Sequence, residues 1–366
     1  MGSQMPSLGV EEEFHLVDPR TRLLAPEAEA LLGRLGDGRF VGEMQRSTVE
    51  TNSSPWQGLD ELGHELRELR RELCAAAAEA DLAPVAVGTV PLANAGSLAL
   101  TPDERFARMH EDYQQVVREQ LICGMQVHVS VPDRDLAVAV VPRVAPWLPV
   151  LLAISASSPY WLGADSGYAS WRTLVWQRWP TAGPSGPFES AAHYDRLVDD
   201  LVASGVISDR GMIYFDVRPS AHVPTLELRV CDACPQVEDV LLVAGLFRGL
   251  VTAAGWEAEA GGPRPEPVRG ELLRAATWRA ARSGMEGELF HPRDGTRAKA
   301  PDMLRKLIAE IRPALEANGD WERVNALAAE ALGRGSAAAR QRMAYTRRGA
   351  LSDVVDLMIE ETASCG

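Results

Sequence analysis

The amino-acid sequence predicts an α+β fold in which a mainly antiparallel β-sheet forms a cleft and helices pack on the opposite face. Four short segments each place a carboxylate, imidazole or guanidinium group on one side of a strand, and three of them alternate cleanly with apolar side chains. None of the four contains Lys, which solvated strands commonly carry. A sheet with one face on helices and the other lining a cleft explains this pattern.

The first of these strands is expected within residues 8–19, which contain three consecutive glutamates. Alternation places Glu11, Glu13 and His15 on one face and apolar side chains on the other, where Glu12 interrupts them. Two carboxylates at positions i and i+2 raise each other's pKa unless a cation lies between them. Such oxygen-rich sites suit Mg²⁺ or Mn²⁺. The alternative is a solvated edge strand whose glutamates only maintain solubility.

A second acidic pair consists of Glu43 and Glu50, and Glu50 lies within a β-prone segment at residues 47–51. The two are seven positions apart in the sequence, which places them on opposite faces of a regular strand. They converge only if the chain bends between them, so Glu50 is the stronger candidate.

Helices are expected where leucine and other apolar residues recur at helical spacing. One of them, at residues 102–119, is expected to start with Thr101 as N-cap and Glu104 as its capping-box partner. A short apolar strand is expected at residues 84–90. The other expected helices cover residues 58–81, 136–157, 194–204, 236–260, 271–282, 302–317, 321–332 and 351–362.

The segment at residues 122–131 alternates cleanly, with Gln126, His128 and Ser130 on one face. A lone His on a strand is usually an ordinary surface or hydrogen-bonded residue, but the nearby Gln favours a site. Residues 212–234 are expected to form a hairpin with a second charged face, which carries Tyr214, Asp216, Arg218, Thr225, Glu227 and Arg229. Cys231 and Cys234 lack the partners of a zinc site and are interpreted as incidental thiols.

Residues 158–180 contain four of the nine Trp together with Arg172 and Arg178. Aromatic and Arg side chains can line a pocket for an anionic ligand, and they can equally form core and cation–π packing. A Gly/Pro-rich loop follows at residues 183–187 and is a candidate flap over a site.

Composition narrows the class of protein. The 366-residue chain is 46% hydrophobic and carries a formal net charge of −14, which argues against nucleic-acid or anionic-membrane binding. No run of about 18 apolar residues predicts a membrane span, and no signal peptide is visible. Five scattered Cys fit a reduced, cytoplasmic protein. We expect one domain over residues 1–366, with residues 261–267 as the best candidate for a boundary.

The motifs also exclude several phosphate-binding and hydrolytic sites. The chain contains no GxxxxGK[ST], GxGxxG, GxSxG or HExxH sequence. Six segments instead match one known family in order and spacing: GVEEEFHLVDP (9–19), VETNSSP (49–55), QVHVSV (126–131), SPYWLGADSGYASWR (158–172), DVRPSAHVPTLELRVCDA (216–233) and WRAARSGMEG (278–287). Together they resemble the type 2 glutamate–cysteine ligase family of carboxylate–amine ligases, which has a glutamine-synthetase-like fold.

The resemblance implies roles for individual residues. Catalytic Mg²⁺ (or Mn²⁺) would be held by a set of acids and one imidazole: Glu11, Glu13, Glu43, Glu50, His128 and Glu227. Catalytic roles fall to His128, Glu227 and Arg229, and Arg229 would face the transferred phosphoryl group with Gln126 beside the nucleotide. Arg172 would hold the carboxylate of the substrate amino acid. Further substrate-binding candidates are Tyr160, Trp161 and Arg218.

The activity implied by the resemblance is ATP-dependent amide formation of the γ-glutamyl type through an acyl phosphate, with a small-molecule amino acid and an amine as substrates. A homo-oligomer such as a dimer is left open. Three alternatives remain: a ligase for a different amino acid and amine in specialised metabolism, a phosphotransferase of guanidino-kinase type, and a catalytically silent nucleotide-binding regulator.

Overall fold

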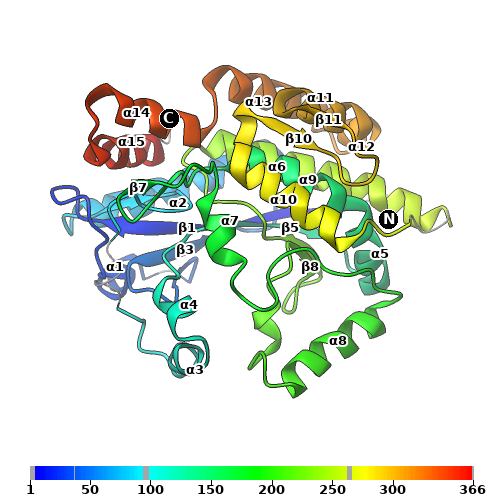
Figure 1. The fold of residues 1–366 in the computed structure, drawn as a ribbon, viewed down its shortest axis with the longest axis horizontal. Helices are drawn as coiled ribbons and strands as arrows, with labels where there is room; N and C mark the ends of the chain where they lie inside the picture. Colours follow the sequence, from blue (N-terminus) through cyan, green and yellow to red (C-terminus); the bar gives the residue numbers. More distant parts are fainter. Residues whose placement is uncertain (1–4, 37, 94–98, 262–265, 365–366) are drawn as a thin grey trace.

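The computed structural model describes residues 5–36, 38–93, 99–261 and 266–364. Its centre is an antiparallel sheet in the order β2-β3-β1-β5-β9-β8, with β4 paired to one end of β1 (Figure 1). The strands of this sheet are β1 (Leu8–Val17), β2 (Phe40–Gly42), β3 (Thr48–Asn52), β4 (Ala83–Val85), β5 (Met125–Ser130), β8 (Val217–Pro219) and β9 (Thr225–Leu228). Two further hairpins pair β6 (Tyr160–Trp161) with β7 (Ala164–Asp165) and β10 (Glu288–Phe290) with β11 (Arg297–Lys299).

Helices on one face of the sheet build the main core. Valines at alternate positions of β5 are buried there together with Leu226 and Leu228 of β9. They pack against α2 (Leu59–Ala78), α5 (Arg134–Val144), α6 (Leu148–Ser155) and α9 (Val237–Glu259). The layer is extended by α10 (Gly270–Ser283), α11 (Ala300–Glu310), α12 (Arg312–Ala317) and α13 (Trp321–Arg334), which contribute to the same core (Figure 1).

The opposite face carries a looser set of elements. These are α3 (Glu104–Tyr113), α4 (Gln115–Arg118), α7 (Trp171–Trp176) and α8 (Ala191–Ala203), and they leave room for a cavity (Figure 1). The helix α1 (Ala28–Leu35) packs instead with α2 and the apolar side chains of β1. At the C-terminal end, α14 (Ala337–Arg348) packs on α15 (Leu351–Ala363) beside β4. The expected α+β class, with an antiparallel sheet and helices behind it, is confirmed.

The middle glutamate of the first strand, Glu12, has a structural role. Its carboxylate accepts hydrogen bonds from Arg70 Nη2 at 2.5 Å and Nε at 3.3 Å, and both side chains are 1% exposed. Arg70 also donates to the carbonyl oxygens of Cys234 and Pro235. The charge that interrupts the apolar face of β1 is therefore neutralised by a buried partner on α2.

Several expected boundaries change. The helix expected at residues 102–119 breaks at Gln114, whose φ is 48°, and its N-cap is Asp103, not Thr101. The Asp103 carboxylate accepts from the backbone N–H groups of Arg105 and Phe106, whereas the Thr101 hydroxyl donates to the Glu43 carbonyl. The capping expectation was wrong because a stronger acceptor stands two residues later.

The apolar segment Arg134–Ser155 forms α5, a 3₁₀ turn and α6. By length and a mean hydropathy of 1.9 it matches a membrane span, contrary to the sequence expectation, but 78% of the apolar window is buried within the protein. Three helices, α1, α7 and α14, were not expected, and residues 302–317 form two helices instead of one. Most of the candidate boundary at residues 261–267 lies outside the described residues.

Candidate active site

Strand register places the predicted site residues in one row across the cleft face. Glu13 lies opposite Glu50 between β1 and β3, and Glu11 opposite Gln126 between β1 and β5. The row continues with His128 opposite Glu227 between β5 and β9, and with Glu227 opposite Arg218 between β9 and β8. Directly opposed residues point to the same face of a sheet, so these side chains are neighbours although they lie far apart in sequence.

Three carboxylates gather at one end of this row, and we call Glu13, Glu43 and Glu50 the acid cluster. One oxygen of each lies within 4.8 Å of the others. Glu43 follows β2, and the chain turns back into β3 before Glu50, so the bend that the sequence left open brings the two together. Glu43 belongs to the group as fully as Glu50.

Burial and mutual repulsion disfavour charge in the acid cluster. Burial, with the neighbouring Glu13, raises the pKa of Glu43 to about 7. Burial, with Glu43, Glu11 and Glu13, raises the pKa of Glu50 well above its usual range. Among the described residues, no Arg, Lys or His forms an ion pair with the three carboxylates. A bound divalent cation would remove this repulsion, so the donor set fits a metal.

Hydrogen bonds from the chain orient the acid cluster. Glu13 accepts from the backbone N–H of Gly124 at 2.5 Å and from Gln126 Nε2 at 3.0 Å. Glu50 accepts from Asn52 Nδ2 at 3.2 Å, and Glu43 from the backbone N–H of Met44 at 3.3 Å. These bonds leave other carboxylate lone pairs available to a ligand.

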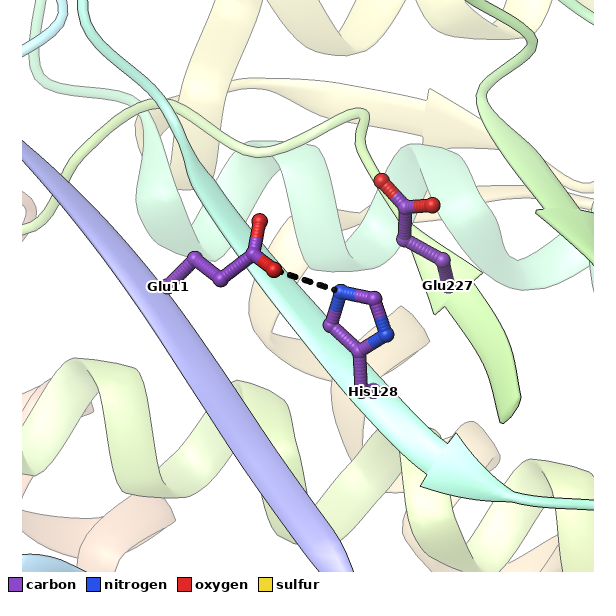
Figure 2. Close-up of side chains that lie close together, drawn as sticks. All are labelled: Glu11, His128 and Glu227. Carbon is purple, nitrogen blue, oxygen red and sulfur yellow. Dashed lines mark ion pairs between the residues drawn. The ribbon is translucent and has the colours of Figure 1, made fainter. Parts of the chain in front are cut away.

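A second group, which we call the His cluster, consists of Glu11, His128 and Glu227, with ligand atoms within 4.8 Å of one another. Figure 2 shows the imidazole of His128, on β5, standing between the carboxylates of Glu11 and Glu227. His128 Nε2 lies 3.2 Å from Glu11 Oε1, while Nδ1 lies 2.8 Å from the Thr225 hydroxyl. Thr225 therefore fixes the ring orientation, a role that sequence reasoning missed.

Two guanidinium groups neutralise Glu227. Arg218 donates to it through Nε at 2.8 Å and Nη2 at 3.3 Å, and Arg229 forms a close ion pair with the same carboxylate. Burial opposes ionisation of Glu227, but Arg229 and then Arg218 outweigh burial and lower its pKa to about 2.

Arg218 was expected to bind substrate, and the structure assigns its donors elsewhere. Besides the two bonds to Glu227, its Nη1 donates to the carbonyl oxygens of Gly211 and Ile213. Arg218 does not line the cavity beside the acid cluster. The hairpin register makes it a counter-ion of Glu227, and its contact with substrate stays a prediction.

A cavity of about 230 Å³ opens over the acid cluster. Its lining includes Glu11 as well as the acid cluster, together with apolar side chains and with Arg172, Arg229 and Arg105. The aromatic and apolar members of the lining are Met44, Phe106, Met109, Ile122, Trp176, Trp179 and Tyr214. The cavity thus brings together carboxylates that need cations and guanidinium groups that can bind anions.

Arg229 and Arg172 both contact the aromatic wall. The Arg229 guanidinium lies 5.9 Å from the ring centroids of Trp176 and Tyr214, and Arg172 lies 5.7 Å from that of Trp176. Burial opposes the charge on Arg229, but Glu227, Glu13 and Glu11 raise its pKa further above its usual range. Arg229 therefore stays cationic beside the acids.

Tyr160 and Trp161 do not belong to the cavity lining. Tyr160 is 2% exposed and packs with Val17, Val85 and the C-terminal helices, and Trp161 stands beside it in the β6–β7 hairpin. A substrate contact by either residue therefore stays a prediction. Trp176 and Tyr214 take the aromatic positions instead, and the alternation of residues 212–218 was the signal that could have indicated Tyr214.

The sheet and its two carboxylate clusters define a class of protein: an α+β enzyme-like scaffold whose antiparallel sheet carries acidic ligand sets and arginines at one cavity. The chain belongs to the glutamate–cysteine ligase family 2 (GCS2), whose model matches residues 7–357. The family resemblance expected from the sequence is thereby confirmed.

Named relatives agree with this assignment. The chain is 59% identical over 360 residues to a protein of Frankia casuarinae that carries the name glutamate–cysteine ligase 2-2, and it spans 42% of that relative's length. It is 51% identical over 358 residues to a Mycolicibacterium smegmatis protein of the same name, covering 98% of this chain and 90% of the relative. The chain thus spans less than half of some relatives and nearly all of others.

Solved structures show the same fold. A glutamate–cysteine ligase from Francisella tularensis in complex with AMP superposes with a TM-score of 0.73 at 13% identity, covering 99% of this chain and 90% of that one. A bifunctional glutathione synthetase from Pasteurella multocida gives a TM-score of 0.75 at 14% identity, covering 99% of this chain and 53% of that one.

Proposed function

We propose that this chain is an ATP-dependent carboxylate–amine ligase that forms a γ-glutamyl-type amide through an acyl phosphate. The observation that carries the proposal is the cavity itself, in which the partly buried acid cluster faces the guanidinium groups of Arg172 and Arg229. A reaction between a carboxylate and ATP brings two anions together, and such a cavity supplies the cations that this requires.

Mg²⁺ fits the acid cluster on the chemistry of its donors. Three carboxylates within 4.8 Å repel one another, which the raised pKa values of Glu43 and Glu50 express. The His cluster offers a second set of ligand atoms in Glu11, His128 and Glu227. When bound, Mg²⁺ would neutralise phosphate oxygens and so lower the cost of attack on phosphorus.

The chain's own residues would divide the remaining tasks. Arg229, held by Glu227 and close to two aromatic rings, would stabilise charge on the transferred phosphoryl oxygens. Arg172 would bind the carboxylate of the substrate amino acid, because a planar guanidinium suits that group. Gln126 would orient Glu13 and reach the nucleotide from the floor of the cavity.

Water must be kept from an acyl phosphate until the amine attacks it. The aromatic wall around Trp176, Trp179 and Tyr214 already makes one side of the cavity apolar. The loop at residues 183–187 is tied at its start, where the Gly183 carbonyl accepts from the backbone N–H of Asp216. We propose that its remaining residues close over the site.

Glutamate and cysteine are the proposed substrate pair, because family relatives carry the name glutamate–cysteine ligase. The binding of AMP by a fold neighbour supports a nucleotide substrate. A ligase for a different amino acid and amine would use the same Arg172 and Arg229. The test below therefore has to identify the pair of substrates.

The test measures ADP release from ATP and Mg²⁺ with each of the twenty amino acids, alone and in pairs. A ligase needs a pair for full turnover, and we expect glutamate with cysteine to give the highest rate. Full turnover with a single acceptor would indicate a phosphotransferase, and absence of turnover with every amino acid and pair would indicate a nucleotide-binding regulator.

A further inference from the structure

Gly124 lies where the acid cluster meets Arg172. It directly precedes β5, and its backbone N–H donates the 2.5 Å hydrogen bond that orients the Glu13 carboxylate. Gly124 also forms an isolated antiparallel bridge with Asp232, a carboxylate that is fully buried. A single backbone position therefore contacts both Glu13 of the acid cluster and the strand segment that carries Asp232.

The Arg172 guanidinium occupies the space that a side chain at residue 124 would need. A Cβ atom added at Gly124 would lie 2.2 Å from Arg172 Nη2, 2.8 Å from Cζ and 3.0 Å from Nε. The backbone of Gly124 is not in the left-handed region, so its conformation would accept any residue. Close packing with the guanidinium, and not the backbone, explains glycine at this position.

The guanidinium is held against Gly124 by weak contacts. Its Nη1 and Nη2 donate to the carbonyl oxygens of Val230 at 3.3 Å and Arg229 at 3.5 Å, and Nη1 lies 4.0 Å from Asp232. Within the described part of the chain, Arg172 Nε is buried and lacks a hydrogen-bond partner. A small push from Gly124 would therefore move the end of the side chain without breaking strong bonds.

We propose that Gly124 is a positioning residue that couples substrate binding to the acid cluster, because it sets the distance between the Arg172 guanidinium and the Glu13 carboxylate. The inference rests on the proposed function, in which Arg172 binds the carboxylate of the substrate amino acid. Gly124 itself contacts no substrate; it acts through Arg172 on one side and through Glu13 on the other.

The substitution Gly124→Ala tests the coupling. The atom that an added Cβ meets is the far end of a flexible side chain, so the protein should fold and Arg172 should move. We expect the KM for the carboxylate substrate to rise about tenfold or more, the loss typical of a displaced charged hydrogen bond. The KM for ATP and the Tm should change little.

Gly9→Ala is the matched control. Gly9 lies on the neighbouring strand β1, and its added Cβ would meet its nearest neighbours, His128 Cβ and Ser53 Oγ, at 3.9 and 4.0 Å, which is ordinary contact. This variant carries the same change in backbone entropy without the close approach, so both KM values should stay near those of the wild type.

A double-mutant cycle separates positioning from a general structural effect. In an Arg172→Ala background the guanidinium is absent, so Gly124→Ala should cause no further rise in KM. Equal effects of Gly124→Ala with and without Arg172 would overturn the proposal. So would a crystal structure of Gly124→Ala in which Arg172 keeps its position. That structure needs no activity, so it decides the inference even if the wild type ligates no substrate pair and the proposed function fails.

Discussion

The acid cluster and the His cluster lie on one sheet face, yet they meet opposite electrostatic surroundings. In the acid cluster three partly buried carboxylates face one another, and burial with the neighbouring acids raises the pKa of Glu43 and of Glu50. In the His cluster burial opposes ionisation as well, but Arg229 and Arg218 overcome it and lower the pKa of Glu227. Burial opposes ionisation in both clusters, but among the described residues the pKa rises where no arginine pairs with the carboxylates and falls at Glu227, where two arginines do.

The difference separates two ways of holding negative charge inside a protein. The chain supplies its own cations to Glu227, which stays ionised without any ligand. At Glu13, Glu43 and Glu50 the charge is left for an exchangeable cation to neutralise. We therefore expect added Mg²⁺ to stabilise the acid cluster more than Glu227, and substitutions in the two clusters to differ in their effect on stability.

The largest expected effects come from removing one carboxylate in each cluster. Glu13→Gln and Glu227→Gln should each lower turnover about 10²-fold or more, the loss typical of a transition-state stabiliser. Their effects on Tm without metal should differ. Glu227→Gln should lower Tm because two buried guanidinium groups lose their counter-ion, whereas Glu13→Gln should leave Tm unchanged or raise it.

Both variants are compared by steady-state kinetics at saturating Mg²⁺ and by thermal melting in EDTA. Near-normal turnover of Glu227→Gln would remove Glu227 from the catalytic set. If Glu13→Gln and Glu227→Gln lowered Tm equally, the two clusters would not differ in how their negative charge is neutralised.

Arg229→Ala should lower kcat about 10²-fold and change KM less, because charge on the phosphoryl group develops in the transition state. Its Tm should fall only slightly, since Glu227 keeps both hydrogen bonds from Arg218. Kinetics and melting are measured on the same preparation. A variant that melts early while its folded fraction is fully active would show that Arg229 serves the ion pair alone.

Arg172→Lys should raise the KM for the carboxylate substrate about tenfold, because a point charge cannot replace a bidentate fork. The KM for ATP should not change. Initial rates with each substrate varied in turn give both constants. A rise in the KM for ATP alone would assign Arg172 to the nucleotide.

The smallest expected effect is a pH-dependent stabilisation by Mg²⁺. The folded-state pKa of Glu43, about 7, lies above its usual value of 4.5, so its contribution to stability is present below about 4.5 and lost as pH rises through 7. Glu50 shifts in the same direction. Mg²⁺ should therefore raise Tm by more at pH 8 than at pH 5, by a few degrees.

Glu227 behaves in the opposite sense, because its lowered pKa gives stability that is lost only as pH falls through about 2. Asp216, whose pKa burial raises to about 7 against the influence of Arg172, titrates in the same window as Glu43. The quantity to compare is therefore the shift in Tm on adding Mg²⁺. An equal shift at both pH values, or an unchanged pattern in Glu50→Gln, would argue against metal binding at the acid cluster.

Features that depend on local periodicity were predictable from the sequence. Alternation with period two correctly placed Gln126, His128 and Glu227 on one face, and leucine spacing located α2 within a few residues. Features set by distant pairing were not. The partner of Arg218 follows from the hairpin register, and the convergence of Glu43 with Glu50 follows from the turn between β2 and β3.

The aromatic residues illustrate the same limit. Composition indicated that residues 158–180 could line a pocket, but Trp176 enters it while Tyr160 packs in a separate core. Which ring points inward depends on how the short helix α7 meets the sheet, and a six-residue helix has too little periodicity to reveal its orientation.

The buried ion pair between Glu12 and Arg70 helps to fix the register of β1 in the sheet. Sliding β1 by one residue would turn Glu12 toward the cavity and send Glu11 and Glu13 into the helical core, where one arginine cannot neutralise two carboxylates. Because Glu11, Glu12 and Glu13 are consecutive, a strand shifted by one residue would still place a glutamate at the cavity. The ion pair with Arg70 thus favours the alignment of β1 that places its outer glutamates, Glu11 and Glu13, at the cavity.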